Sequence, residues 1–366
     1  MKILYIGNAR SGNIWRWIEY FAERDYEVHV ISTAPLEQGA IGSEQLHILK
    51  RYNIKIGIIS FPTNLVSSVI QIKQLIKKIS PDILNIHYIT YNGFYGALSG
   101  FHPLVLSAMG SDILVEPSES KLYRMMTSFA LRRADLITTP GENLVDPMIQ
   151  LGADPDKIHL IHPGVDTEKF NPLKINSEKE LMRSYSPTVI SIRSLRPIYN
   201  VETLIKSVPI VLKQVPEARF IIGGGGEQRI YLRDLAKSLG VIDSINFTGF
   251  IPHDQLPGYF NSADIYVSTS LSDGGPSISL MEAMACGLAC IVTNVGDTAK
   301  WIKNGETGYI IPVKRPDMLA ENIISLIKNK KLRQKMGRSN LQLVQQKANY
   351  NKEMAKMAEI YDELIE

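Results

Sequence analysis

The stretch SDGGPSISLMEAMACG (residues 272–287) decides the fold of this chain, because a glycine turn runs directly into an apolar helix. Apolar runs flank it on both sides, ADIYVSTS at 263–270 and LACIVTN at 288–294. Continuous apolar runs of this kind are typical of strands buried on both faces of a parallel sheet. The stretch therefore predicts the crossover helix of a β-α-β unit. Glu282 is the one carboxylate in that apolar helix, and a charged side chain among apolar residues needs an explanation.

The alternation of apolar runs and helix-length segments repeats along all 366 residues, interrupted by a polar stretch at 170–187. We predict an α/β protein with two doubly wound, Rossmann-like domains at 1–169 and 187–349, a ligand site in an interdomain cleft, and a last helix at 350–366. The predicted strands are KILYIG, YEVHVIS, IKIGIIS, ILNIHY, PLVLSAM, ADLITT and KIHLIHP, followed in the second domain by TVISIR, ARFIIGG, SINFTGF, ADIYVSTS, LACIVTN and TGYIIP.

Composition and charge argue against several function classes. The formal net charge is +3, which does not give the positive field of a nucleic-acid binder. Cys286 and Cys290 are predicted to be small buried residues, not a disulfide framework or a zinc site. No apolar stretch reaches ~18 residues, and the N-terminus lacks a signal-peptide pattern, so we expect a cytoplasmic protein. The DPD at 154–156 is predicted to be a proline turn, and no metal is expected.

The start of the helix in the opening stretch is predicted to bind an anion. Pro276 suits the first helical position with Gly275 before it as the cap, so Ser277 and Ile278 would offer amides without partners inside the helix. Glu282 follows within roughly two turns, where its carboxylate can accept both hydroxyls of a ribose. Phosphates at the helix start and a ribose on its flank together indicate a nucleotide. The alternative is a buried glutamate paired with an arginine or a lysine.

Loops after other predicted strands add candidates. Arg193 and Arg196 in SIRSLRPIYN suit a diphosphate, and an interdomain salt bridge is the alternative. GNARSGN (7–13) joins the first strand to the first helix and can hold an anion or a polar acceptor. His87 ends another strand and either faces the cleft or is structural. IIGGGGEQR (221–229) fails the dinucleotide fingerprint and is either a tight turn or a close backbone approach to a ligand.

The chain resembles the retaining glycosyltransferases of family 4, the glycogen-synthase-like group 1, which have the GT-B fold. The resemblance covers nearly the whole chain and implies a nucleotide-sugar donor bound mostly by the second domain. It also implies metal-independent transfer with retained anomeric configuration, and a last helix that crosses back to the first domain. It rests on MEAMACG with CIVTNVGDTAKWIKNGETGYIIP, KIHLIHPGVDTEKFNP, INFTGFIPHDQLPGYFNSADIYVSTS and ARFIIGGGGEQR, in the family's order and spacing.

The resemblance implies roles for particular residues. Glu282 resembles the second Glu of the family's E-x7-E signature, which holds the ribose. The turn and helix start before it resemble the backbone cradle for the diphosphate. Phe250 and Ile251 resemble the loop whose backbone contacts the base. Residues 7–12 resemble the first-domain loop beside the phosphates and the acceptor.

Three positions depart from the family's pattern. The first Glu of the signature is replaced by Gly274, and Asp273 lies one residue too far unless the turn holds an extra residue. The Lys of the GR-x4-K anion clamp is replaced by Tyr199, so the arginine of the clamp must be one of the two in SIRSLRPIYN. The His of an HGSD-like segment is replaced by Met109, while Asp112 remains.

We therefore predict an enzyme that moves a sugar from a UDP- or GDP-sugar to a glycan, lipid-linked or small-molecule acceptor, with no cofactor and no nucleic-acid partner. The departures leave two alternatives open, a non-catalytic nucleotide- or glycan-binding homologue and a GT-B nucleotide-sugar epimerase. SSVIQIKQLIKKI (67–79) is either a helix for peripheral contact with the inner face of the membrane or an ordinary sheet-covering helix. The candidate residues are Arg193, Arg196, Asp112 and Asp273 in catalysis, Glu282, Ser277, Ile278, Gly275, Phe250, Ile251 and Gly223 for the nucleotide, and Gly7, Asn8, Ser11, Gly12, His87 and Met109 for the acceptor and phosphates.

Overall fold

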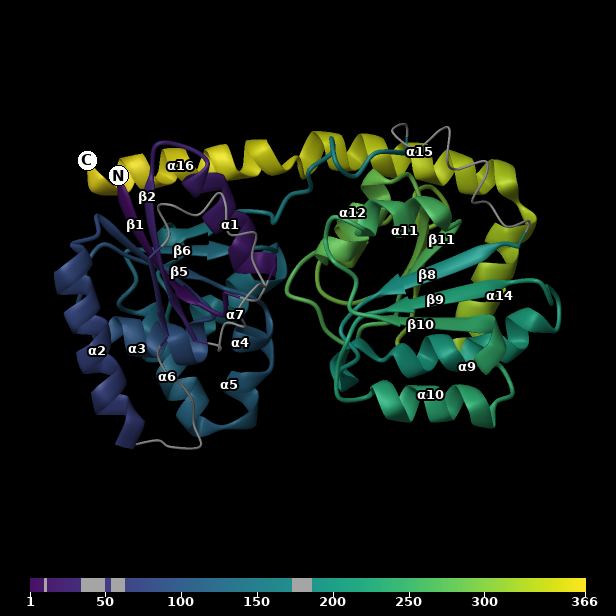
Figure 1. The fold of residues 1–366 in the computed structure, drawn as a ribbon, viewed down its shortest axis with the longest axis horizontal. Helices are drawn as coiled ribbons and strands as arrows, with labels where there is room; N and C mark the ends of the chain where they lie inside the picture. Colours follow the sequence, from purple (N-terminus) through teal and green to yellow (C-terminus); the bar gives the residue numbers. More distant parts are fainter. Residues whose placement is uncertain (10–11, 34–49, 54–62, 173–185) are drawn as a thin grey trace. The chain divides into compact units, whose positions relative to one another are not determined.

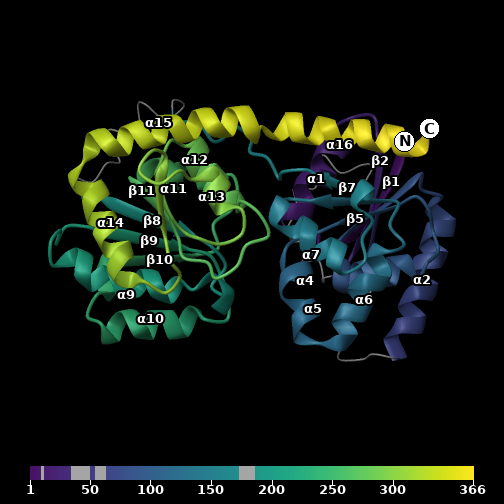
Figure 2. The same ribbon diagram turned by 180° about the vertical axis from the view of Figure 1, so that it is seen from behind.

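The chain folds into two compact α/β units. The structure is a computed structural model, and it describes residues 1–9, 12–33, 50–53, 63–172 and 186–366. Unit 1 consists of Met1–Pro163 with Glu353–Glu366, and unit 2 of Gly164–Lys352. In each unit helices cover both faces of one parallel sheet (Figures 1 and 2). The predicted α/β fold class with two Rossmann-like, doubly wound halves is confirmed.

Among the described residues, unit 1 forms a seven-stranded sheet in the order β3-β2-β1-β4-β5-β6-β7. Its elements are β1 (Lys2–Gly7), α1 (Gly12–Ala22), β2 (Glu27–Ser32), β3 (Lys50–Asn53), α2 (Thr63–Ile79), β4 (Ile83–His87), η2 (Ile89–Gly93), α3 (Phe94–Ala97), β5 (Leu104–Ser107), α4 (Ser111–Leu114), α5 (Glu116–Glu119), α6 (Lys121–Leu131), β6 (Leu136–Thr139), α7 (Val145–Gln150), β7 (Ile158–Leu160) and α16 (Tyr350–Ile365). Leu4 and Ile6 of β1 pack in the core with α2, α3 and α6. The predicted strand at 54–60 lies outside the described residues.

Unit 2 forms, within residues 186–352, a six-stranded sheet in the order β10-β9-β8-β11-β12-β13. Its strands coincide with the six apolar runs predicted for the second half. Its elements are β8 (Thr188–Ile192), η6 (Pro197–Tyr199), α9 (Val201–Leu212), β9 (Arg219–Gly223), α10 (Arg229–Ser238), β10 (Ile245–Gly249), α11 (Leu256–Ser262), β11 (Ile265–Ser268), α12 (Ile278–Ala285), β12 (Ala289–Thr293), α13 (Thr298–Trp301), β13 (Gly308–Ile311), α14 (Pro316–Lys328) and α15 (Lys330–Lys347).

Two apolar cores cover the two faces of the unit 2 sheet. Successive residues of a strand point to opposite faces, so Ile265 packs with α9, α10 and α14, whereas Tyr266 packs with α11, α12 and α15 (Figure 1). The thiols of Cys286 and Cys290 are buried in the second core, as predicted. Burial raises the pKa of the Cys290 thiol, so it stays protonated at neutral pH.

The end of the chain returns to unit 1 and is fastened there by a buried polar row. The Tyr361 hydroxyl of α16 accepts from Asn85 Nδ2 and lies 3.4 Å from the Tyr5 hydroxyl. Ser107 Oγ donates to Asn85 Oδ1 at 3.0 Å, and Thr138 Oγ1 donates to Ser107 Oγ at 2.9 Å. The row crosses four neighbouring strands. Because buried polar groups are costly without partners, it fixes where α16 can dock.

Helix α15 lies against the turn that ends α12. Gly287 in that turn has φ +71°, and a Cβ added to Gly337 of α15 would lie 2.0 Å from the Gly287 carbonyl oxygen. Asn340, one turn further along α15, donates from Nδ2 to the carbonyls of Leu288 and Thr307 at 2.8 Å each. Close backbone contact and these two hydrogen bonds therefore set the position of α12, whose start borders the candidate site described below.

We expect Gly337→Ala to destabilise unit 2. A Cβ cannot sit 2.0 Å from a backbone oxygen, so the two helices must move apart. The expected loss is about 2 kcal/mol in the free energy of unfolding, the usual range for an overpacked contact. Gly258→Ala is the matched control, because Gly258 lies inside α11 with no atom within 4 Å of an added Cβ. That control should be neutral or stabilising by about 0.5–1 kcal/mol.

The measurement is urea unfolding followed by tryptophan fluorescence. Trp301 is buried in unit 2 at 4% exposure and becomes the reporter when Trp15 and Trp17 of unit 1 are both replaced by phenylalanine. Equal midpoints for the two glycine variants in that background would show that the contact between α15 and the α12 turn is not tight.

Candidate functional site

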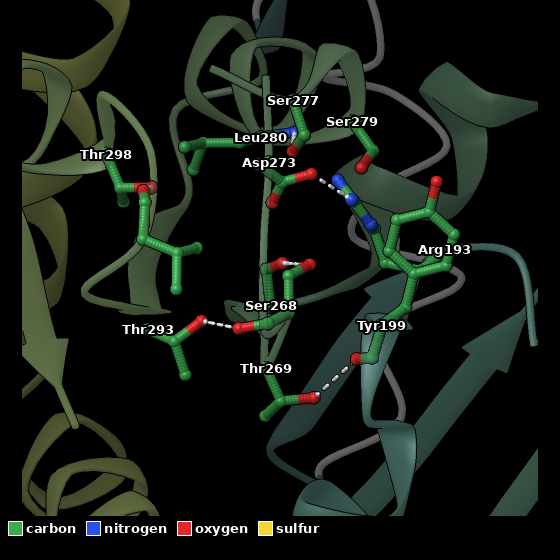
Figure 3. Close-up of polar contacts among 12 residues, drawn as sticks. Arg193, Tyr199, Ser268, Thr269, Asp273, Ser277, Ser279, Leu280, Thr293 and Thr298 are labelled. Carbon is green, nitrogen blue, oxygen red and sulfur yellow. Dashed lines mark hydrogen bonds and ion pairs between the residues drawn. The ribbon is translucent and has the colours of Figure 1, made fainter. Parts of the chain in front are cut away.

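A hollow lies at the C-terminal edge of the unit 2 sheet, beside the start of α12 (Figure 3). The strand order reverses between β8 and β11, and ligands of open parallel sheets bind at such a switch point. The hollow is shallow and partly open to solvent. The lining residues are Ser268, Asp273, Ser277, Leu280, Val292, Thr293, Val295 and Thr298.

The start of α12 differs from the sequence prediction by two residues. Ser277, not Gly275, is the N-cap, and its hydroxyl accepts from the Leu280 amide at 3.3 Å. The helix begins at Ile278, not at Pro276, because the serine hydroxyl can satisfy a helix amide and glycine cannot. The amides left for an anion are therefore those of Ile278 and Ser279, one residue later than predicted.

The loops after β8 and β11 are joined by hydrogen bonds to the backbone of the first loop. Thr269 Oγ1 donates to the Asn200 carbonyl at 2.9 Å and to the Tyr199 carbonyl at 3.2 Å (Figure 3). The Leu271 amide donates to the Ile198 carbonyl at 2.8 Å. Asn200 adopts a left-handed conformation with φ +47°, a conformation that asparagine tolerates better than most residues. These contacts give the edge of the hollow a fixed shape.

Arg193 reaches from the end of β8 to the loop after β11. Its Nη2 donates to Asp273 Oδ1 at 2.5 Å, and its guanidinium carbon lies 4.2 Å from the centre of the Tyr199 ring (Figure 3). The Arg193 and Asp273 side chains are 8% and 15% exposed, so the pair is shielded from water. Burial lowers the pKa of Arg193, but the charge and hydrogen bond of Asp273, together with the nearby Tyr266 and Tyr199, raise it by more, so the pKa lies above its ordinary value. Arg193 is therefore a fixed positive charge.

The structure separates the two candidate arginines. Arg196 is exposed at the start of η6, while Arg193 points toward the hollow. The interdomain salt bridge considered for them is wrong for Arg193, because Asp273 belongs to the same unit. Arg193, Tyr199 and Asp273 thus form one cluster. Tyr199 stands at one position where the chain departs from the family's pattern, and Asp273 directly precedes another, Gly274. Gly274 contributes no side chain there, and Asp273 borders the hollow in its place.

Glu282 is buried on α12 at 2% exposure. Its Oε1 lies 3.0 Å from Nε2 of His253, which follows β10. Among the described residues, one partner of Glu282 is therefore an imidazole, and the alternative of an arginine or lysine partner stays open. His253 and Glu282 are 29 residues apart, so no local sequence signal predicts their pairing.

The loop after β10 begins with an exposed aromatic ring. Phe250 is 81% exposed, whereas the next residue, Ile251, is 7% exposed and packs in the core beside α12. Gly249 before them has φ +73°, which turns the chain at the end of the strand. An exposed ring at this edge offers a flat surface on which a base can stack.

The four-glycine loop after β9 packs against the loop after β8. A Cβ added to Gly224 would lie 2.0 Å from the Arg193 carbonyl oxygen, and one added to Gly226 would lie 2.4 Å from that of Leu195. Gly223 ends β9 and accepts from the Arg193 amide at 3.1 Å. Of the two interpretations, the described contacts support the tight turn, which braces the loop carrying Arg193.

In unit 1, Asp112 fixes the backbone of the segment MGSD. Its carboxylate accepts from the amides of Ile89 at 2.8 Å, Met109 at 3.0 Å and Gly110 at 2.8 Å, and the side chain is 0% exposed. Burial raises the pKa of Asp112 to about 6, against the effect of these amide bonds, so the group is ionised at neutral pH. These amide contacts give Asp112 a supporting role for the backbone of this segment, and the catalytic role predicted for it stays a prediction.

His87 ends β4 and is 3% exposed. Its ring centre lies 5.2 Å from that of Trp17, and neither ring nitrogen has a hydrogen-bond partner within the described part of the chain. Burial lowers the pKa of His87 to about 3, so its imidazole is neutral at pH 7. Gly7 ends β1 next to it, and Asn8 is exposed. Of the other predicted loop residues, Gly12 begins α1 and Ser11 lies outside the described residues.

No group of three or more His, Cys, Asp or Glu side chains in the described residues is arranged to hold a metal ion. In the DPD motif, Asp154 Oδ1 accepts from the Asp156 amide at 3.1 Å, which forms the predicted turn. A search of the same described ranges finds no helix long and apolar enough to span a bilayer.

Comparison with known proteins assigns the chain to a family. The sequence family described as "Glycosyl transferases group 1" matches residues 174–342, and the family "Glycosyl transferase 4-like" matches residues 2–140. Together the two matches cover well over half of the chain. The protein belongs to the group 1 glycosyltransferases of the GT-B fold, as the resemblance predicted.

Curated relatives are similar at a distance. A GDP-mannose-dependent alpha-(1-6)-phosphatidylinositol monomannoside mannosyltransferase of Mycobacterium tuberculosis is 28% identical over 212 residues, 55% of either chain. That match therefore spans about half the length of the relative. N-acetyl-alpha-D-glucosaminyl L-malate synthase of Bacillus anthracis is 22% identical over 94% of this chain and 91% of its own.

Solved structures share the whole fold. HepE of Anabaena, in complex with UDP and glucose, superposes with a TM-score of 0.82 at 20% identity over 100% of both chains. Sucrose-phosphate synthase of Thermosynechococcus elongatus superposes with a TM-score of 0.83 at 18% identity, covering 100% of this chain and 99% of its own. At these identities the likeness establishes the architecture of both units.

We expect Arg193 and Asp273 to be energetically coupled. Asp273→Asn leaves a buried guanidinium without its counter-charge and should lower the free energy of unfolding by about 3 kcal/mol. Arg193→Met leaves a buried carboxylate and should cost a similar amount. The double variant leaves neither charge, so it should cost clearly less than the sum of the two.

The same urea unfolding with Trp301 as reporter measures this cycle. Asp317→Asn is the matched control, since the ion pair of Asp317 with Arg315 lies on unit 2 with both side chains about half exposed. That control should leave stability nearly unchanged, because exposed ion pairs contribute little. Strict additivity of the Arg193 and Asp273 variants would argue that the short contact between them has no energetic consequence.

Proposed function

We propose that this protein transfers a sugar from a nucleoside-diphosphate sugar to an acceptor hydroxyl, with retained anomeric configuration. The observation that carries the proposal is the order of groups along one edge of unit 2. The start of α12 and Arg193 suit a diphosphate. Glu282 on the flank of α12 suits the two hydroxyls of a ribose. The exposed ring of Phe250 suits a base. This order of phosphate, ribose and base sites is the order of groups in a nucleoside diphosphate.

The main catalytic task is to stabilise the leaving group. The bond between the anomeric carbon and the β-phosphate oxygen breaks, and a bond from that carbon to the acceptor oxygen forms. Negative charge grows on the β-phosphate, where the amides of Ile278 and Ser279 and the charge of Arg193 can stabilise it. Arg193 has five N–H donors, and its bond to Asp273 uses one of them, so it can contact a phosphate as well. These groups supply the charge for a metal-independent reaction.

The acceptor's proton passes to the departing phosphate oxygen in this proposal. No separate base is then required, so Met109 in place of the family's histidine is compatible with transfer. His87, neutral at pH 7, is not needed as a proton donor. At the sugar end, Asp273 borders the hollow together with Ser277, and we assign it to hydrogen bonds with the donor sugar.

The donor is proposed to be a UDP- or GDP-sugar, and the acceptor a glycan, a lipid-linked molecule or a small molecule. One relative is named for GDP-mannose, and one structural neighbour holds UDP with glucose, which supports testing both bases. No further cofactor is assigned, and the cytoplasm remains the predicted location.

Peripheral membrane contact is part of the proposal for a lipid-linked acceptor. Val66 and Ile70 of α2 are 64% and 49% exposed, with Lys73 and Lys77 further along the same helix. Ile72 is buried in the core of unit 1, so α2 also covers the sheet. Exposed apolar residues beside lysines suit an interfacial helix.

The test starts with ligand-linked stabilisation. The full chain is heated with UDP, GDP, ADP and their common sugars, and the compound that raises the melting temperature identifies the base. Release of the nucleoside diphosphate is then measured with candidate acceptors. We expect stabilisation by one base and acceptor-dependent release. Tight nucleotide binding without turnover of any donor would favour the non-catalytic alternative, and donor conversion without acceptor would favour the epimerase.

Glu282→Gln tests the ribose site directly. It keeps the shape of the side chain but removes the charge that two ribose hydroxyls would contact. Each hydrogen bond to a charged group contributes about 1.5–3 kcal/mol, so we expect nucleotide affinity to fall by roughly 10–100-fold with the fold retained. Titration calorimetry measures the affinity and circular dichroism checks the fold. Unchanged affinity with a large loss of stability would instead support a purely structural buried pair.

A further inference from the structure

His253 lies between two charged side chains. Its Nδ1 is 3.2 Å from Lys169 Nζ, and its Nε2 is 3.0 Å from Glu282 Oε1. A lysine ammonium can only donate hydrogen bonds, so Nδ1 must accept. The proton of the neutral imidazole then sits on Nε2 and is donated to Glu282. The two distances therefore give a direction to the chain of hydrogen bonds, from Lys169 through His253 to the carboxylate.

Lys169 is held in place by the turn on which it lies. Asp166 Oδ1 accepts from the amides of Glu168 at 2.9 Å and Lys169 at 3.1 Å. The next residue, Phe170, is 0% exposed, and its ring centre lies 5.3 Å from that of His253. The turn thus anchors the lysine backbone and also provides one wall for the imidazole. This turn follows Gly164, where unit 2 begins, so the segment that enters unit 2 delivers a side chain to the candidate ribose site.

We propose that Lys169 and His253 are positioning residues that hold the Glu282 carboxylate in the orientation needed for the ribose. The inference rests on the proposed function, which makes Glu282 the ribose ligand. Glu282 is 2% exposed, so its orientation depends on protein donors more than on water. The His253 side chain is 49% exposed, so it links the buried carboxylate to the surface of unit 2. A carboxylate accepts several hydrogen bonds, so it can keep the imidazole and still bind hydroxyls.

A packing role for His253 makes a different prediction. Packing against Phe170 requires the ring but not its nitrogens, and His253→Phe preserves the ring. Positioning requires a donor toward Glu282 and an acceptor toward Lys169, and the amide of His253→Gln supplies both. The two variants therefore separate packing from hydrogen bonding. In the same way, Lys169→Met removes the donor to His253 Nδ1, whereas Lys169→Arg keeps a donor there.

The experiment measures ribose preference in the full chain. Titration calorimetry compares UDP and GDP with their 2′,3′-dideoxy analogues, which lack the hydroxyls that Glu282 would contact. We expect the wild type to bind the parent of its preferred base about 10–100-fold more tightly than the analogue. His253→Phe should reduce that preference about 5–10-fold and Lys169→Met about 2–5-fold, through loss of one charge-linked hydrogen bond. His253→Gln and Lys169→Arg should stay within about 2-fold of the wild type. Lys237→Met is the control, because Lys237 forms an exposed pair with Asp234 elsewhere on unit 2.

The outcomes separate this inference from the function on which it rests. A wild type without ribose preference would overturn the ribose role of Glu282, and the positioning role would fall with it. A wild-type preference that His253→Phe retains in full would overturn the positioning role alone. Imidazole nitrogen NMR spectra of the free protein give a second readout that packing would not change. The proton of His253 should be on Nε2. A proton on Nδ1 would contradict the chain of hydrogen bonds from Lys169 through His253 to Glu282.

Discussion

The ion pair between Arg193 and Asp273 joins the two loops on which the candidate site is built. One loop follows β8 and the other follows β11, and the strand order of the sheet reverses between these strands. Connections on either side of such a reversal run in opposite directions, so a crevice opens between them. The ion pair spans this crevice. Thr269 and Leu271 also form hydrogen bonds to the loop after β8, which hold the two loops together. Because both charges are shielded from water, separating the loops would leave charge buried and unpaired.

The burial of Glu282 follows from the same geometry. Helix α12 packs against other elements over most of its surface, and its residues from Leu280 to Ala285 are all buried. Glu282 lies within this buried stretch. A carboxylate at such a position is unfavourable unless donors surround it. His253 supplies one donor in the free protein, and the proposed ribose would supply others. The presence of one glutamate in this apolar helix is therefore explained by the groups that donate hydrogen bonds to its carboxylate, and not by how the side chain packs.

Much of the fold could be predicted from the sequence because its signals are local. The apolar runs that became β8 to β13 are each a few residues long, and their continuity alone indicates a sheet covered on both faces. The position of α12 was also clear, but its first residue was not. Pro276 and Ser277 both carry a helix-start signal, and the hydroxyl of Ser277 decides between them by accepting the Leu280 amide.

The contacts that give the site its chemistry could not be predicted, since they join distant parts of the chain. Arg193 and Asp273 are 80 residues apart, and Lys169 and His253 are 84 apart. Their pairing depends on the order of strands in the sheet, which the apolar pattern does not specify. The resemblance to a family supplied positions such as Glu282 and exposed the departures at Tyr199 and Gly274. It did not indicate that Tyr199 and Asp273 contact the same guanidinium.

That shared contact changes how the departures should be weighed. Counted separately, the two departures are two arguments for lost activity. Tyr199 replaces the lysine of the anion clamp, and Gly274 replaces the first glutamate of the signature. In the structure Tyr199 places its ring against the Arg193 guanidinium, and Asp273 neutralises it from the loop that lacks the glutamate. A lysine at position 199 would instead bring a second cation to the same guanidinium. A decaying site loses such groups independently and leaves charges without partners. Here the replacements satisfy one another, so they count as a single change and do not argue against the proposed donor site.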